Sequence, residues 1–369
     1  MSVHNSQAAT VAVLGAGAWG TALAQTLASD GRDVLIWARE AEVIAAINAT
    51  RANPQFLPGA RLHPTIRATD DLAELATVPV LLAVTPAQHL GTVLARLGPT
   101  QADVVLCAKG IEAGTGRLMA DVARAASPQA RLAVLSGPTF AHEVAAGLPT
   151  AVTLACSGGD EQWQRLSAVI ARPAFRPYFS EDVIGAEIGG AVKNVLAIAC
   201  GVVEGLGLGQ NARASLIARG FAELQRFGLA LGAQVETLAG LSGLGDLVLT
   251  CSSTSSRNFS LGKALGEGAR ADAVLASAAT VAEGAYTAPV LADLAAQRGI
   301  AMPIVAAVAA LVAGTVPARE AVAGLLARPL RAEHDLASGA EHELASRAEH
   351  DLASGAEHDL ASRAEHDFG

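Results

Sequence analysis

Cysteine is scarce in this chain of 369 residues, and its copies do not form a motif. The sequence contains no C-x-x-C pair and no cluster of cysteine with histidine at metal-ligand spacing. This pattern excludes a small disulfide-stapled scaffold and argues against a metal site, and it fits a reducing compartment. The four cysteines are Cys107, Cys156, Cys200 and Cys251.

Basic residues are in the minority. The chain contains 26 lysines and arginines against 35 acids, which gives a formal net charge of −9. Residues 331–369 alone hold ten acids and three arginines, a difference of −7, so the rest of the chain is close to neutral. A chain without a basic excess lacks the electrostatic footprint of nucleic-acid binding, and we expect no nucleic-acid partner.

Signals for export and membrane insertion are lacking as well. Residues 1–10 are polar and do not show the basic-then-apolar layout of a secretory signal. The stretch 299–318 carries no charge, but it is rich in alanine and has glycine and proline near both ends. It therefore predicts a buried helix of a soluble domain, not a span of ~20 strongly apolar residues. We expect a cytoplasmic protein without stable membrane insertion.

The sequence does contain a regular alternation of strand and helix patterns. Hydrophobic residues make up 51% and aromatic residues 4%, so the chain can bury a large core that consists mostly of Ala, Val and Leu. Over residues 11–180, unbroken apolar runs alternate with alanine-rich helical stretches, which predicts a parallel sheet covered on both faces. The expected fold class is α/β, with a Rossmann-type doubly wound domain. The runs are VAVLG, VLIWA, VPVLLAVT, DVVLCAK, RLAVLSG and AVTLACS.

Composition divides the chain into three parts. We expect the α/β domain over residues 1–183, a mostly helical domain over 184–330 and a low-complexity tail over 331–369. The tail holds five imperfect copies of an eight-residue unit. Eight residues advance a helix by about 80° beyond whole turns, so the repeated leucines form no stripe. We expect this tail to be disordered or loosely helical and without catalytic function, although its histidines leave metal binding open.

A glycine motif occupies the first strand-to-helix turn. Gly15, Gly17 and Gly20 follow a predicted buried strand and open a predicted helix, so a dinucleotide pyrophosphate is expected at the helix N-terminus. An ordinary glycine-containing turn is the competing interpretation.

Arg39 ends the second strand, where NAD-specific folds usually carry an acid, and an arginine there can meet a 2′-phosphate. NADP is therefore at least accepted, while Glu40 keeps NAD open.

Polar groups in apolar surroundings mark a candidate catalytic site. Lys109 ends a predicted strand, at the edge where ligands gather in open α/β sheets. Lys193 lies in an apolar helix, where it either extends to solvent or serves as a general base with a lowered pKa, and a satisfied structural lysine is the competing interpretation. Further polar groups of the helical domain include a set suited to phosphate oxygens. They are Asn194, Asp246, Ser255, Ser256, Arg257 and Asn258.

Taken together, these segments resemble the bacterial NAD(P)-dependent glycerol-3-phosphate dehydrogenases. The resemblance covers residues 11–330 and implies reversible hydride transfer between dihydroxyacetone phosphate and sn-glycerol 3-phosphate, which feeds glycerophospholipid synthesis. It implies NADP or NAD as the cofactor and a small phosphorylated substrate as the partner, and it leaves a homodimer open. The matching segments are GAGAWGTALA, NPQFLPG, AVTPAQ, AKGIE, LSGPTFAHEVAAGLPTAV, GGAVKNVLAIACGVVEGLGLGQNARA, GLSGLGDLVLTCSSTSSRNFSLGKALGEG and TVAEGAYTAP.

The resemblance also implies roles for individual residues. Lys193 would be the general acid/base at the C2 hydroxyl. Substrate would be bound by Lys109, Gly137, Thr139, Lys193, Asp246, Ser256, Arg257 and Asn258. The cofactor site would be formed by Gly15, Gly17, Ala18, Trp19, Gly20, Arg39, Phe56, Lys109, Ala141, Arg257, Val281 and Glu283.

Two other functions stay open at this point. One is a two-domain dehydrogenase that acts on a different hydroxy acid or on an amine-linked product, and the run 256–258 together with Lys193 argues against it. The other is a nucleotide-sensing protein that has lost its chemistry. Such a protein should lack some substrate groups, whereas Lys109, Lys193, Asp246 and Arg257 are all present.

Overall fold

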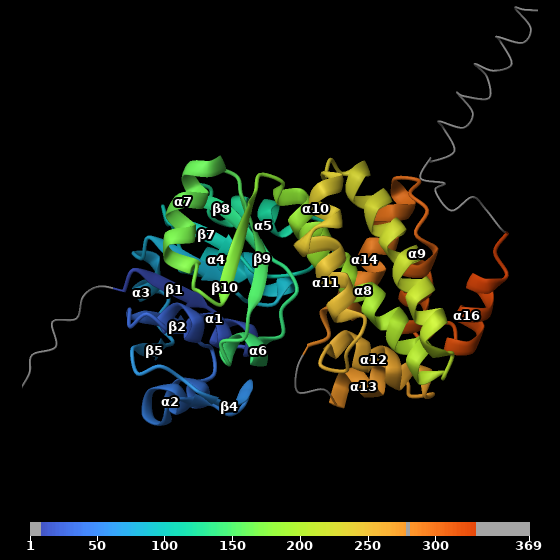
Figure 1. Cartoon of the computed structure of the whole chain (residues 1–369), viewed down its shortest axis with the longest axis horizontal. Helices are drawn as coiled ribbons and strands as arrows, with labels where there is room; N and C mark the ends of the chain where they lie inside the picture. The colour runs from blue at the N-terminus through green and yellow to red at the C-terminus, as the bar shows by residue number, and fades with distance from the viewer. Residues whose placement is uncertain (1–8, 278–280, 330–369) are drawn as a thin grey trace, which may run out of the picture.

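The computed structural model describes residues 9–277 and 281–329 (Figure 1). The repeat tail predicted for residues 331–369 lies outside the described residues, as does the polar segment 1–8. Within the described part, an α/β half and a helical half lie side by side.

An eight-stranded sheet forms the centre of the α/β half (Figure 1). In sheet order the strands are β10 (Phe175–Ser180), β9 (Thr150–Cys156), β8 (Arg131–Ser136), β7 (Asp103–Leu106), β6 (Val80–Ala83), β1 (Val11–Leu14), β2 (Val34–Trp37) and β5 (Ile66–Thr69). Every predicted apolar run forms a strand, and β1, β2, β6 and β7 are buried throughout because helices cover both faces. β5 and β10 complete the two edges, where polar residues interrupt the apolar pattern.

The prediction of a parallel sheet is wrong at β9. This strand pairs antiparallel with β8, and β10 then pairs parallel with β9. A parallel crossover takes a dozen or more residues and usually a helix that returns the chain to the starting edge. The connection 137–149 is long enough for a crossover, but its helix α6 (Ala141–Ala145) rises only about 7.5 Å and packs beside α1 (Ala18–Ala28). The chain therefore turns back into the sheet from the end at which β8 left it.

Helices cover the two faces of the sheet and form a separate core on each. The bounds are α2 (Ala41–Thr50), α3 (Ala73–Ala76), α4 (Leu90–Leu97), α5 (Met119–Ala126) and α7 (Gly159–Ile170). On one face α1, α2 and α7 bury side chains such as Leu23, Ile47 and Leu166. On the other face α3, α4 and α5 bury Leu75 and Leu94 among others. The carboxyl ends of the central strands, between these layers, are left for ligands.

The helical half is built around α8 (Val183–Gly205), and residues 183–277 and 281–329 contain no strand. Among the described helices α8 alone has the length and apolar composition of a membrane span, but 89% of its most apolar window is buried inside the protein. The longest helix in the uncharged stretch 299–318 is α15 (Pro303–Val312), which has ten residues. The other helices are α9 (Gly209–Ala230), α10 (Val235–Ala239), α11 (Asp246–Thr250), α12 (Arg257–Gly266), α13 (Ala271–Ser277), α14 (Glu283–Gln297) and α16 (Ala318–Leu326).

Glycines let α8 and α12 pack at very short distance. A Cβ atom at Gly201 would stand 2.0 Å from the carbonyl oxygen of Phe259, and one at Gly262 would stand 1.9 Å from the carbonyl oxygen of Ile198. A side chain at either position would push the two helices apart. The first turn of α12, which carries the predicted phosphate-binding run, is therefore fixed against the helix that carries Lys193.

Candidate active site

The glycine turn lies between β1 and α1, at the carboxyl ends of the central strands. Gly15 has a φ of 122°, and a Cβ atom there would lie 3.1 Å from the carbonyl oxygen of Val84. A Cβ atom at Gly20 would lie 1.8 Å from the carbonyl oxygen of Gly15. Gly17, by contrast, faces open space, and no side chain caps the N-terminus of α1. Uncapped N–H groups beside an open space fit a cofactor pyrophosphate.

Three charged side chains from three elements meet where the two halves join. Lys193 Nζ of α8 donates to Asp246 Oδ1 of α11 at 2.5 Å, and Lys109 Nζ, after β7, donates to Asp246 Oδ2 at 2.7 Å. The Asp246 side chain is fully buried, and those of Lys109 and Lys193 are 14% and 7% exposed. Lys193 Nζ also donates to Thr250 Oγ1 at 2.9 Å, and Lys109 Nζ to the carbonyl oxygen of Gly137 at 3.3 Å.

A π-helical turn over Leu241–Gly245 brings Asp246 to α8. Its backbone runs so close to α8 that a Cβ atom at Gly189 would lie 2.3 Å from the carbonyl oxygen of Ser242. Such turns are rare and occur frequently at functional sites. The close approach that glycine allows here puts the carboxylate within hydrogen-bond distance of the lysine pair.

Burial lowers the pKa of Lys193 to about 8. Loss of solvent around the ammonium is the largest cause; Asp246 acts in the opposite direction, and the nearby Lys109 ammonium lowers the pKa further. The side chain is 7% exposed and does not extend to solvent, which was one of the possibilities for a lysine in an apolar helix. An amine that titrates near neutral pH can take up and release a proton under ordinary conditions.

A second polar network joins α8, α12 and α14. Asn258 Nδ2 donates to Asn194 Oδ1 at 2.9 Å, and Asn258 Oδ1 accepts from the Gly284 N–H at 2.9 Å. Ser256 caps α12, because its hydroxyl oxygen accepts from the Phe259 N–H at 3.2 Å. These bonds hold the start of α12 against α8 and α14. The contact on α8 is Asn194, the residue that follows Lys193.

Glu283, at the start of α14, connects the helical half to the sheet. Its Oε1 accepts from the N–H of Ala87, just beyond the end of β6, at 3.3 Å. Burial raises the pKa of Glu283, while Arg257, Lys109 and Lys193 act on it in the opposite direction. These three cations therefore surround one site, to which both halves of the molecule contribute.

Arg39 lies away from the lysine pair, at the end of β2. Its side chain is 76% exposed and forms an ion pair with Glu40 at 2.8 Å. β1 and β6 separate the β2 end from the β7 end that carries Lys109. The ends of β2 and β7 are therefore three strand spacings of about 4.8 Å apart, a distance that an extended dinucleotide across the strand ends can cover.

The other predicted residues differ in burial. Gly137 is buried and Val281 is exposed, and the half-buried ones are Ala18, Trp19, Phe56, Thr139 and Ala141.

Two buried polar residues were not predicted, Thr250 beside Lys193 and Glu187 nearer the start of α8. Thr250 holds Lys193, and it lies four residues after Asp246 on one helical face, a spacing that was visible in the sequence. Glu187 lies six residues before Lys193 in α8 and is 6% exposed. A charged residue in an apolar helix was the pattern that singled out Lys193, and Glu187 shows the same pattern.

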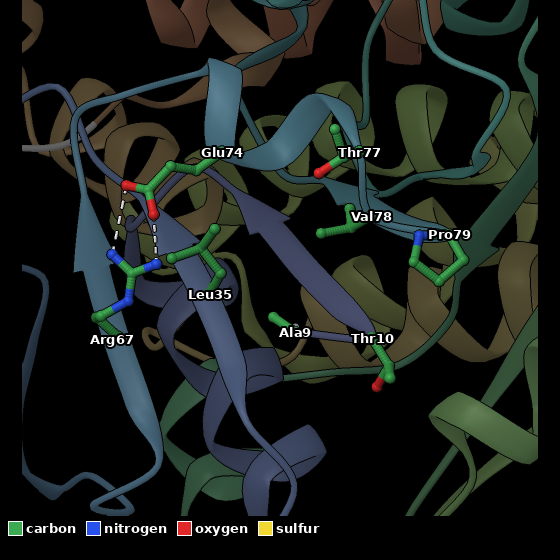
Figure 2. A pocket seen from close by; sticks show the side chains of 8 residues that line it. All are labelled: Ala9, Thr10, Leu35, Arg67, Glu74, Thr77, Val78 and Pro79. Atoms are coloured by element: carbon green, nitrogen blue, oxygen red, sulfur yellow. Dashed lines mark hydrogen bonds and ion pairs between the residues drawn. The ribbon is translucent and has the colours of Figure 1, made fainter. Parts of the chain in front are cut away.

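A pocket of about 410 Å³ lies at the amino ends of the strands, opposite the glycine turn (Figure 2). Thr10, before β1, and Pro79, before β6, contribute to its wall. Arg67 and Glu74 form an ion pair at one side of it, as Figure 2 shows. None of the predicted site residues lines this pocket, so the lysine pair remains the candidate for chemistry.

Comparison with known protein families covers both halves of the chain. The N-terminal family of NAD-dependent glycerol-3-phosphate dehydrogenase matches residues 10–162, and the C-terminal family matches residues 182–323. The chain belongs to the NAD-dependent glycerol-3-phosphate dehydrogenase family. The first match ends within α7, and the second begins one residue before α8, where the helical half starts.

Similar proteins include close bacterial relatives. The NAD(P)+ glycerol-3-phosphate dehydrogenase of Novosphingobium aromaticivorans is 76% identical over 326 residues, which are 88% of this chain and 98% of the relative. That of Erythrobacter litoralis is 70% identical over 327 residues, 89% of this chain and 98% of the relative. The crystal structure of glycerol-3-phosphate dehydrogenase from Coxiella burnetii is 39% identical, with a TM-score of 0.82 over 86% of this chain and 98% of that one. This likeness confirms the predicted fold class.

Proposed function

We propose that this chain catalyses the reversible, NAD(P)-dependent interconversion of dihydroxyacetone phosphate and sn-glycerol 3-phosphate. The observation that carries the proposal is the buried arrangement of Lys193 and Lys109 around Asp246, where the two halves meet. The names of the relatives support the same reaction. We assign the cofactor mainly to a domain of residues 1–183, and the acid/base and phosphate groups to a domain of residues 184–330.

Lys193 is proposed to move the proton. In oxidation its neutral amine accepts the proton of the C2 hydroxyl, and in reduction its ammonium returns a proton to the C2 oxygen. When bound, the nicotinamide cofactor would supply the hydride chemistry at C2. Asp246 and Thr250 take two hydrogen bonds from Nζ, which fixes the direction in which the amine faces the substrate.

The phosphate end of the substrate is proposed to lie at the N-terminus of α12. Ser256 caps this helix, Arg257 is an exposed cation in its first turn, and Asn258 is held by its hydrogen bond to Asn194. A helix N-terminus attracts anions, and a guanidinium fork matches phosphate oxygens. Lys109 would contact the substrate from the sheet side. Gly137 and Thr139 are assigned to the same side.

The cofactor is proposed to extend from the glycine turn to the end of β2. The open space at Gly17 and the uncapped N-terminus of α1 fit the pyrophosphate. The Arg39 guanidinium can pair with the 2′-phosphate of NADP, and the Glu40 carboxylate can accept from the ribose hydroxyl of NAD. The further cofactor residues assigned by resemblance are Gly15, Ala18, Trp19, Gly20, Phe56, Lys109, Ala141, Arg257, Val281 and Glu283.

In the cell the reductive direction would supply sn-glycerol 3-phosphate for glycerophospholipid synthesis. We propose a cytoplasmic location, where both the cofactor and the phosphorylated substrate are available. The four cysteines are free thiols and buried, which is consistent with a reducing compartment.

Steady-state assays with dihydroxyacetone phosphate and each reduced cofactor test the proposal, and turnover with at least one cofactor is expected. Absence of turnover with both would refute it.

Lys193→Ala should lower kcat by roughly two to four orders of magnitude, the range for loss of a general base, while the Kd of the cofactor stays unchanged. Lys263→Ala is the control, because Lys263 is paired with Glu267 on α12 and is 38% exposed. Unchanged kcat in Lys193→Ala would place the base elsewhere.

A further inference from the structure

The segment between β7 and α5, residues 107–118, crosses from the α/β half into the helical half. Ile111 and Leu118 form an isolated antiparallel bridge that closes it into a loop. Both side chains belong to the buried core of the helical half, together with Ile188 of α8. Ala186, two residues earlier in α8, belongs to a core on the sheet. The junction of the two halves therefore runs through this crossing segment and the first turns of α8.

Polar bonds hold both ends of the crossing segment to the helical half. Near its start, Lys109 Nζ donates to Asp246 Oδ2 at 2.7 Å. At its end, the Ala120 N–H of the first turn of α5 donates to Glu187 Oε1 at 2.7 Å. No side chain of the preceding residue caps α5. Glu187 of α8 thus supplies the N-terminal cap that α5 lacks.

We infer that Glu187 is a positioning residue for the lysine pair. It ties the end of the crossing segment to α8 six residues before Lys193, and thereby holds Lys109 where both ammonium groups reach the same carboxylate. The inference rests on the proposed function, because its test measures the rate of the proposed reaction. A misplacement of about 1 Å can cost about 100-fold in rate, so a bond distant from the substrate can matter.

Hydrogen-bond acceptance, more than charge, is the property that this position uses. Burial raises the pKa of Glu187 to about 8; Asp121 of α5 acts in the same direction and Arg124 of α5 in the opposite one. Near neutral pH the carboxyl is largely protonated and still offers an acceptor oxygen to α5. Glutamine keeps such an oxygen in nearly the same place and is the matched substitute.

The helical half contains a second carboxyl of the same design. Glu223 of α9 is 1% exposed and accepts from the N–H groups of Ile304 at 2.7 Å and Val305 at 3.1 Å, in the first turn of α15. Burial raises the pKa of Glu223 to about 7. Both helices lie within the helical half, so Glu223 is a control for the loss of a buried cap that is not at the junction.

The variants Glu187→Ala, Glu187→Asp, Glu187→Gln and Glu223→Ala separate positioning from stability. We expect Glu187→Ala and Glu187→Asp to lose about 10- to 100-fold in kcat/KM for the phosphorylated substrate. Glu187→Gln should stay within about threefold of wild type, because the acceptor is retained. The Kd of the cofactor should change much less than kcat/KM in all four variants, because Lys109 is the only proposed cofactor residue that the crossing segment carries.

The pH profile of glycerol 3-phosphate oxidation reports the pKa of Lys193, which depends on the position of Lys109. Around Lys193, Asp246 raises the pKa, Lys109 lowers it, and Thr250 accepts a hydrogen bond. If Lys109 moves away, the pKa of Lys193 rises and the acidic limb of kcat/KM shifts to higher pH. We expect a shift of about half a pH unit or more in Glu187→Ala and Glu187→Asp, and none in Glu187→Gln or Glu223→Ala.

Wild-type kcat/KM in both Glu187→Ala and Glu187→Asp would overturn the inference. An equal shift of the limb in Glu223→Ala would also overturn it, because any lost cap would then have the same effect. So would a Glu187→Gln variant as impaired as Glu187→Ala. Where alanine prevents folding, the aspartate variant decides, since it keeps a carboxyl and only withdraws it by one methylene. An inactive wild-type protein would instead refute the proposed function, so the two failures are distinguishable.

Discussion

Replacement of Asp246 by asparagine tests the electrostatics of the site in the most direct way. The change keeps the size of the side chain and removes the charge that two lysines share. Because Asp246 is fully buried and the Lys193 and Lys109 side chains are 7% and 14% exposed, neither ammonium group can turn into water without a rearrangement. The variant therefore leaves two cations facing each other in a poorly solvated site.

The magnitude follows from the distances. At 2.5 and 2.7 Å, each ion pair amounts to about 6–7 kcal/mol of Coulomb energy at an effective dielectric constant of about 20. The cost of desolvation cancels much of this, and removal of one partner from a buried pair typically costs about 3–5 kcal/mol. We expect a loss of that size in the free energy of unfolding of Asp246→Asn near neutral pH.

The loss should depend on pH because Lys193 titrates. Burial lowers the pKa of Lys193 to about 8, although Asp246 acts in the opposite direction. Below this pKa the ion pair is fully formed, and above it the amine is largely neutral, so the difference between wild type and variant shrinks as the pH rises. The variant also loses the carboxylate that raises the pKa of Lys193, so the acidic limb of the oxidation rate should move to lower pH.

Urea unfolding at about pH 6.5 and about pH 9.5 measures this difference, with Asp103→Asn as the control. Asp103 is a buried carboxylate as well, but its partners Arg131 and Arg165 are 52% and 44% exposed and can turn toward water. The control should lose less stability and keep the wild-type pH profile. A loss below about 1 kcal/mol in Asp246→Asn, the range of an exposed pair, or the same loss at both pH values, would refute the electrostatic reasoning.

Two further predictions concern cofactor choice and the tail. Arg39→Ala should lower kcat/KM with NADPH about tenfold relative to NADH, because a charge-assisted pair with the 2′-phosphate is lost; equal losses with both cofactors would contradict this assignment. Deletion of residues 331–369 should leave kcat within about twofold, since every proposed site group lies in the part of the chain before the tail. A tenfold loss would show that the tail takes part in catalysis.

The central strands were predictable because a parallel strand that is buried on both faces has an unbroken apolar sequence. β1, β6 and β7 are unbroken apolar runs, since helices exclude water from both of their faces. The edge strands escaped prediction because one side is less enclosed and tolerates Arg67 in β5 and Arg176 in β10. The reversal at β9 depends on the packing of α6 beside α1, a contact between segments more than 100 residues apart.

The sequence by itself determined the secondary structure of the α/β core, the dinucleotide turn and the identity of Lys193 as an unusual lysine. These features depend on burial and backbone geometry within short stretches of chain, which residue patterns record. Only the tertiary structure decided which groups meet. Asp246 lies 53 and 137 residues from its two lysines, and Glu187 lies 67 residues from Ala120. Such pairs depend on how closely whole helices approach one another, and no local pattern encodes that distance.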